Sequence, residues 1–203
     1  MHNWPIHSLK EFYNNRYDKH GNDIKSVGWG SVESQKLRFK ILSEIADLSS
    51  AKICDVGCGF GDLYPYLNKR FKNIKYAGID ISEKLIRQAQ TCYPDVHFFL
   101  EDILQSKREK EFDYVLASGT LSYRMNNHLE YVEAMLTGML KMAKRGVAVN
   151  FLSSYVDYRL DKNFHFAPEE AFALGKRLAR YVTIRHDYPL YEFTFYLYHD
   201  ARS

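Results

Sequence analysis

The sequence predicts an α/β fold: a doubly wound sheet of about seven strands, mostly parallel, that ends in a C-terminal hairpin with one antiparallel strand. Short apolar runs alternate with amphipathic segments between residues 52 and 152, and a glycine-rich loop follows the first of these runs. Strands that alternate with helices form a parallel sheet with helices on both faces. Two further strand-like runs near the C-terminus are separated only by a short turn, so they must run antiparallel.

Each strand and helix is expected from a local pattern. Strands are expected at residues 52–56, 75–79, 96–100, 113–117 and 147–152, and the hairpin strands at 181–186 and 192–198. Helices are expected from residue 31 to about 47, after the glycine loop, from residue 82, over 129–143 and over 168–180. Ser31 and Ser82 are good N-cap residues, and Lys144, Arg145 and Gly146 are typical of a helix end.

Residues 1–30 show no clear helical or strand periodicity, but they are rich in aromatic rings. Disordered segments are poor in such residues, so this stretch is predicted to pack on the domain as an arm. We expect residues 1–50, the arm and the helix after it, to cover the binding site. Residues 51–203 would then hold the ligand-binding part of what is one structural domain overall.

The helix predicted to begin at Ser31 carries two polar residues on its apolar stripe. At 100° per residue, Gln35 and Arg38 fall on the same stripe as Phe39 and Leu42. Polar side chains that face a core need partners. Either the protein itself bonds them, as in a salt bridge between Arg38 and an acidic neighbour, or they face a ligand.

The composition disfavours several classes of protein. The 203 residues suit one domain, and the net charge of +3 comes without a concentrated basic stripe, which disfavours nucleic acid as a partner. Cys54, Cys58 and Cys92 form no C-x-x-C pair, so neither a disulfide framework nor a metal site is predicted. No apolar run approaches the ~20 residues of a membrane span, and no signal peptide is recognisable. We therefore expect a cytoplasmic protein that is not bound to a membrane. The sequence does not indicate its oligomeric state.

The strongest motif is the loop Asp55-Val56-Gly57-Cys58-Gly59-Phe60-Gly61, which a predicted strand enters and a predicted helix leaves. Glycines permit positive φ angles and let a ligand approach the backbone closely. The helix that follows offers free N–H groups at its start. In open α/β sheets, ligands bind beyond the carboxyl ends of the strands, so this loop is the expected binding site.

Acidic residues end the next two predicted strands. Asp80 follows the second strand, where a carboxylate can accept hydrogen bonds from both hydroxyls of a ribose. Glu101 and Asp102 follow the third strand. The Asp102 carboxylate could accept from the amino group of an adenine, and Ile103 could pack on the face of that base. Together with the glycine loop, these residues predict a nucleoside site.

The stretch from residue 53 to residue 152 resembles the Rossmann-like core of class I S-adenosylmethionine (SAM)-dependent methyltransferases. The resemblance is carried by residues 55–61, 80–81, 101–103 and 112–118, and by the reversed last strand. It implies SAM as the cofactor, with a methionine part that lies beside Asp55, Gly57 and Gly59. It also implies Asp80 at the ribose, Asp102 and Ile103 at the adenine, and Ala117 and Ser118 beside the sulfonium. Cys58 and Ile81 are expected to bind the cofactor as well. Arg38, with Gln35, could bind the carboxylate of the cofactor's methionine end.

The resemblance implies an enzyme that transfers a methyl group, by in-line displacement, to an O or N atom of a small-molecule acceptor. Alternatives are a tRNA or protein methyltransferase, an NAD-dependent oxidoreductase and a non-catalytic nucleotide-binding protein. The NAD fingerprint is G-x-G-x-x-G, whereas here the third glycine comes one residue early and Asp62 stands in its place. A carboxylate there would repel a pyrophosphate. The proline motif of amino-group nucleic-acid methyltransferases is missing after the fourth predicted strand.

The acceptor pocket is expected to be formed by three parts of the chain. Methyl transfer needs a general base only if the acceptor keeps its proton at neutral pH. Tyr123, after the fourth strand, is the candidate catalytic base or orienting group. The candidate acceptor-binding residues, which include it, are Tyr13, Tyr17, Trp29, Tyr123, Tyr155 and His165.

Overall fold

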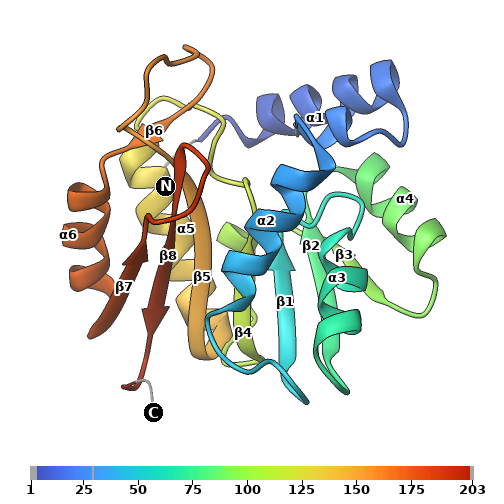
Figure 1. Ribbon diagram of the computed structural model, residues 1–203. Helices are drawn as coiled ribbons and strands as arrows, with labels where there is room; N and C mark the ends of the chain where they lie inside the picture. The colour runs from blue at the N-terminus through green and yellow to red at the C-terminus, as the bar shows by residue number, and fades with distance from the viewer. Residues whose placement is uncertain (1–3, 29, 202–203) are drawn as a thin grey trace.

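One sheet separates two layers of helices in the computed structural model, which describes residues 4–28 and 30–201 (Figure 1). Its strands are β1 (Lys52–Val56), β2 (Lys75–Asp80), β3 (His97–Leu100), β4 (Phe112–Ala117), β5 (Ala143–Ser153), β6 (His165–Phe166), β7 (Tyr181–Arg185) and β8 (Glu192–Tyr198). The strand order is β3-β2-β1-β4-β5-β8-β7, and β6 pairs with β5 outside this path. The β1 to β5 strands are parallel, whereas β8 is antiparallel to both β5 and β7. The predicted sheet with its reversed C-terminal strand is confirmed; the two-residue β6 was too short to be predicted.

Helices cover both faces of this sheet. They are α1 (Ile6–His20), α2 (Val32–Ser43), α3 (Leu63–Arg70), α4 (Glu83–Cys92), α5 (His128–Met142) and α6 (Pro168–Leu178), with short 3-10 turns at Ile24–Val27 and Ile103–Gln105. One apolar core lies under α2, α3 and α4, and the other under α5 and α6. Figure 1 shows α1 across the edge at which the parallel strands end. No helix in the described ranges is long and apolar enough to cross a membrane.

The central strands divide their side chains between the two cores. In β1, Ile53 joins the core under α2 and α3, whereas Cys54 and Val56 join the core under α5. In β4, Leu116 and Ala117 are split between the cores in the same way. Because side chains alternate along a strand and both faces are buried, these strands appear in the sequence as continuous apolar runs.

The structure corrects three predicted boundaries. Residues 6–20, expected as an arm without regular structure, form α1, and the helix expected to reach residue 47 ends at Ser43. The helix α5 ends at Met142, so Gly146 lies inside β5 rather than at a helix end. A Cβ at Gly146 would lie 2.9 Å from the Leu197 carbonyl oxygen. This glycine therefore permits the close approach of β8.

Both predicted N-caps are confirmed. The hydroxyl oxygen of Ser31 accepts from the Ser34 N–H at 3.1 Å, and that of Ser82 accepts from the Leu85 N–H at 3.3 Å. Each bond satisfies one of the free N–H groups at a helix start. The two serines therefore fix where α2 and α4 begin, on either side of the glycine loop.

The packing of β8 against α6 makes a testable stability prediction. Phe195 is fully buried in β8, whereas Phe172 of α6 is 45% exposed. We expect Phe195→Ala to lower the free energy of unfolding by about 3–5 kcal/mol, because it opens a cavity in the core. The matched change Phe172→Ala should cost less than about 1 kcal/mol. Urea unfolding measures both, and equal losses would contradict this packing.

Candidate functional site

The glycine loop turns sharply from the end of β1 toward α3. Gly57, Gly59 and Gly61 have φ angles of 70°, 54° and 77°, a region that other residues rarely adopt. The N–H groups of Gly57 and Cys58 both donate to the Ile79 carbonyl oxygen of β2, at 2.8 and 3.1 Å. The loop is thereby held against the end of the neighbouring strand, with its backbone at the edge of a cleft.

Asp80, the last residue of β2, connects the glycine loop to the start of α4. Its carboxylate accepts from the Gly59 N–H at 3.0 Å and from the Ser82 N–H at 2.8 Å. Burial raises the pKa of Asp80, and the N–H donors of Ser82, Gly59 and Ile81 lower it in part. A carboxylate that accepts two bonds still has lone pairs for ligand hydroxyls.

Asp55 lies under the same loop. The Tyr76 hydroxyl donates to its Oδ2 at 2.6 Å. Burial raises the pKa of Asp55 to about 7; the Tyr76 hydrogen bond lowers it, and the nearby carboxylates of Asp80 and Asp62 raise it further. A positive charge placed among these groups would favour their ionised forms.

A cleft of about 910 Å³, counted with its open mouth, lies between this loop and α1. Its described lining includes five carboxylic acids and no lysine, arginine or histidine. The acids are Asp55, Asp62, Asp80, Glu101 and Asp102. A site of this kind suits a ligand that carries positive charge.

The solved structures with a similar fold include two methyltransferases. Magnesium protoporphyrin IX methyltransferase from Synechocystis, crystallised with SAM, has a TM-score of 0.67 at 17% identity and covers 94% of this chain and 97% of its own. A Burkholderia thailandensis N1-methyltransferase, crystallised with 1,6-didemethyltoxoflavin and S-adenosylhomocysteine, has a TM-score of 0.71 at 17% identity and covers 94% of this chain and 86% of its own. At this identity the likeness concerns the fold.

Sequence relatives give the family. Residues 53–146 match a family described as a methyltransferase domain. Rv1506c of Mycobacterium tuberculosis, named as a methyltransferase, is 34% identical over 149 residues, which cover 70% of this chain and 89% of that protein. The chain belongs to the class I SAM-dependent methyltransferases. Trans-aconitate 2-methyltransferase of Escherichia coli is 27% identical over 100 residues, which cover 49% of this chain and only 39% of that enzyme.

Most residues expected at the cofactor of this methyltransferase line the cleft. They are Gln35, Asp55, Gly57, Cys58, Gly59, Asp80, Ile81, Asp102, Ile103 and Ser118. Gln35 also donates to Asp62 Oδ2 at 3.1 Å. The Ser118 hydroxyl oxygen is buried and has no hydrogen-bond partner among the described residues, so it is available to a ligand.

Two expected cofactor residues lie elsewhere. Ala117 is fully buried in the core under α5. Arg38 forms an ion pair with Glu192, so the salt bridge that the sequence left open is the arrangement found. The two polar residues on the stripe of α2 thus both have partners within the protein, but only Gln35 also lines the cleft.

The expected acceptor residues are spread more widely. Tyr13 lines the cleft, whereas the Tyr17 hydroxyl donates to Gln88 Oε1 at 3.1 Å. The ring of Tyr123 packs on Phe12, with 4.7 Å between centroids, outside the cleft lining.

The remaining acceptor candidates come from the segment after β5 and from the arm. Tyr155 is 63% exposed, and His165 lies in β6; neither is in the described lining of the cleft. Trp29 lies outside the described residues.

Among the apolar and aromatic side chains of the lining that sequence reasoning missed, four come from α1 and α5. Ile6 and Leu9 come from α1, and Tyr131 and Met135 come from α5. A signal was present in the first case, because Ile6, Leu9 and Tyr13 are three and four residues apart, which is helical spacing. In the second case the apolar stripe of α5 indicated burial, but it did not show which turn would reach the cleft.

The close contact between Gly57 and Thr120 leads to a prediction about stability. A Cβ at Gly57 would lie 2.4 Å from Thr120 Oγ1, which donates to the Val56 carbonyl oxygen at 2.8 Å. Gly28 also has a positive φ, 88°, but its described surroundings leave room for a Cβ. We expect Gly57→Ala to destabilise the protein by roughly 1–3 kcal/mol more than Gly28→Ala, measured by urea unfolding.

The double variant Gly57→Ala/Thr120→Ala supplies the check. It should recover part of the excess loss, because the clashing atoms are gone. Equal losses in the two glycine variants would mean that the loop is not held against Thr120.

Proposed function

We propose that the cleft binds SAM and that the protein transfers its methyl group to an O or N atom of a small-molecule acceptor. In this proposal the methionine end lies at the Gly57–Gly61 bend, the ribose at Asp80 and the adenine at Asp102 and Ile103. The observation that carries the proposal is the acidic lining of a cleft whose floor is a positive-φ glycine loop. The fit of the residues to this cofactor is supported further by the available hydroxyl of Ser118.

Charge favours this cofactor over a dinucleotide. SAM carries a sulfonium cation and no phosphate, so the buried carboxylates of Asp55 and Asp80 would stabilise it. The pyrophosphate of NAD would meet Asp62 at the loop, and the described lining contains no basic side chain to offset the repulsion. The same groups therefore favour one nucleotide cofactor and oppose the other.

The residues of the chain act by binding and orientation. Bound SAM would supply a methyl carbon that the sulfonium already activates. The Asp80 carboxylate would accept hydrogen bonds from the ribose hydroxyls. Its bonds to the N–H groups of Gly59 and Ser82 would keep the carboxylate in place. Asp102, whose Oδ1 accepts from the Leu104 N–H at 3.0 Å, would present its other oxygen to the adenine. Holding two reactants in line supplies much of the rate of such a reaction.

The acceptor would lie under α1, where Ile6, Leu9 and Tyr13 line the cleft. Burial raises the pKa of Tyr13 to about 12, and the charge of Asp80 adds to the shift. At neutral pH the Tyr13 hydroxyl therefore keeps its proton, and it would orient the acceptor as a hydrogen-bond donor. Tyr123 packs on Phe12 outside the described lining of the cleft, and we propose it as the second polar group on the acceptor side.

A ligand screen tests the cofactor. SAM and S-adenosylhomocysteine should raise the melting temperature, whereas NAD should not, because of the acidic lining. Asp80→Ala should weaken SAM binding more than tenfold by calorimetry, since it removes the proposed ribose contact. Asp95→Ala, at an exposed turn position, is the control and should bind as the parent does. Stabilisation by NAD alone would overturn the proposal.

The raised pKa of Asp55 predicts that SAM binding depends on pH. Folding raises the pKa of Asp55 from 3.8 to about 7. The protonated carboxyl therefore contributes to stability fully below pH 3.8, and this contribution is lost as the pH rises through about 7. A bound cation favours the ionised carboxylate, so SAM affinity should rise by up to about tenfold from pH 5.5 to 7.0.

Calorimetry across this range measures the effect. Asp55→Asn should bind SAM more weakly at pH 7.0 and should lose most of the pH dependence, whereas Asp95→Asn should keep it. A parent affinity that stays constant from pH 5.5 to 7.0 would show that no titrating carboxylate faces the cofactor.

A further inference from the structure

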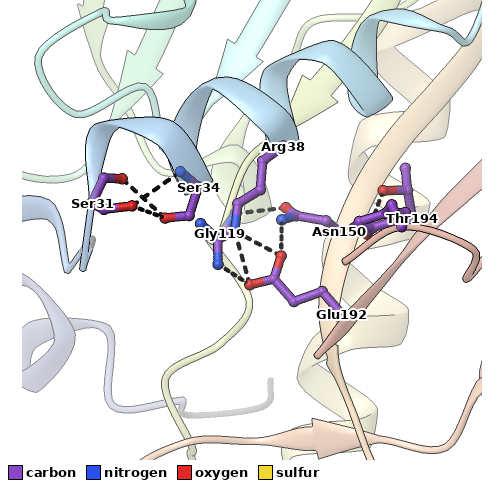
Figure 2. A network of polar contacts seen from close by, with 8 residues as sticks. Ser31, Ser34, Arg38, Gly119, Asn150, Glu192 and Thr194 are labelled. Atoms are coloured by element: carbon purple, nitrogen blue, oxygen red, sulfur yellow. Dashed lines mark hydrogen bonds and ion pairs between the residues drawn. The ribbon is translucent and has the colours of Figure 1, made fainter. Parts of the chain in front are cut away.

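A buried network of polar side chains connects α2 with β8 and β5 (Figure 2). Arg38 Nε donates to the two carboxylate oxygens of Glu192 at 2.8 and 2.7 Å, and its Nη2 donates to the same carboxylate. Asn150 Nδ2 donates to Glu192 Oε2 at 2.9 Å. Glu192 and Asn150 are only 4% and 2% exposed. We refer to these three residues as the Arg38–Glu192–Asn150 network.

The network ends at the cleft. Asn150 Oδ1 accepts from the Gly119 N–H at 2.8 Å, as Figure 2 shows. Gly119 belongs to the loop after β4, residues 118–120, all three of which line the cleft. Its φ of 71° is the conformation that glycine adopts readily. The next residue, Thr120, touches the glycine loop through its bond to Val56. The Gly119 N–H is therefore the point at which the network holds the loop after β4.

Each member of the network restricts the next. The Arg38 guanidinium can only donate, so the Glu192 oxygens face it as acceptors. An acceptor carboxylate requires the NH₂ group of Asn150, and this leaves Asn150 Oδ1 toward the Gly119 N–H. If the Asn150 amide were flipped, its NH₂ group would face the Gly119 N–H. Two donors would then face each other, and a buried donor would be left without an acceptor. The charge pair thus selects one orientation of the amide.

We infer that the Arg38–Glu192–Asn150 network is a positioning device that sets the loop after β4 for cofactor binding. A buried ion pair is weak evidence for a stabilising role, because desolvation offsets much of its attraction. This network, however, ends on a backbone N–H at the cleft, beside the available hydroxyl of Ser118. The expected weakening of SAM binding when the network is broken rests on the proposed function. The expected effect of the network on the position of the loop does not.

The experiment compares Asn150→Leu with Tyr188→Phe. Asn150→Leu removes the bond to Gly119 and leaves Arg38 facing Glu192. Tyr188→Phe removes another buried hydrogen bond of β8, the 3.0 Å contact between the Tyr188 hydroxyl and Thr194, and does not touch the loop after β4. Calorimetry measures the Kd for SAM, urea unfolding measures stability, and amide hydrogen exchange of Gly119 in the unliganded protein reports the position of the loop.

Asn150→Leu should raise the Kd at least tenfold and abolish the exchange protection of Gly119, whereas Tyr188→Phe should change neither by more than twofold at a similar loss of stability. Retained Gly119 protection in Asn150→Leu would overturn the inference, and so would equal weakening of binding by the two variants. If the parent protein does not bind SAM, the proposed function fails, and Gly119 exchange still decides whether the network holds the loop.

The double variant Arg38→Gln/Glu192→Gln tests the role of charge. It keeps hydrogen-bonding groups at both positions, but an amide in place of the Glu192 carboxylate can present either its O or its NH₂ to Asn150. Gly119 protection should therefore fall only partly, between the parent and Asn150→Leu. Full protection would show that the ion pair does not select the orientation of the Asn150 amide.

Discussion

The site depends on one buried carboxylate, Asp80, which accepts hydrogen bonds from both the glycine loop and the start of α4. Its bonds to the N–H groups of Gly59 and Ser82 tie the glycine loop after β1 to the start of α4. The positive φ of Gly59 belongs to the turn that brings its N–H to Asp80, and the N-cap at Ser82 fixes the first turn of the helix. The site proposed for the cofactor is therefore held together by hydrogen bonds from backbone N–H groups.

This arrangement leaves an excess of negative charge under the loop. Asp55 and Asp80 are both buried, burial raises the pKa of each, and the charge of Asp80 adds to the rise at Asp55. Tyr76 stabilises the charged form of Asp55 through its hydroxyl, but burial is the stronger effect. A cationic ligand would relieve the repulsion between these carboxylates. The acidic lining of the cleft is therefore consistent with a cofactor that carries a positive charge.

The sequence was sufficient for the sheet and for the residues near the glycine loop, because both follow from local patterns. The glycines, the strand-end acids and the capping serines each act within a few residues of their own position. By contrast, the partner of Arg38 is Glu192, 154 residues away, and only the register of β8 brings them together. The helix α1 was missed because its apolar residues are fewer than its polar ones, although Ile6, Leu9 and Tyr13 keep helical spacing. The acceptor pocket was least predictable, since it depends on how α1 and α5 pack.

The reversed direction of β8 has a consequence for the edge of the sheet. Parallel strands deliver only their last residues to the ligand-binding edge, but a strand that runs the other way delivers its first. Glu192 opens β8 and pairs in register with Leu152, near the end of β5. The C-terminal hairpin thus contributes the carboxylate of the Arg38–Glu192–Asn150 network, which reaches the cleft through the Gly119 N–H. A shift of β8 by a single residue would turn the Glu192 carboxylate to the opposite face of the sheet. The length of the short turn between β7 and β8 therefore influences the structure of the ligand-binding edge.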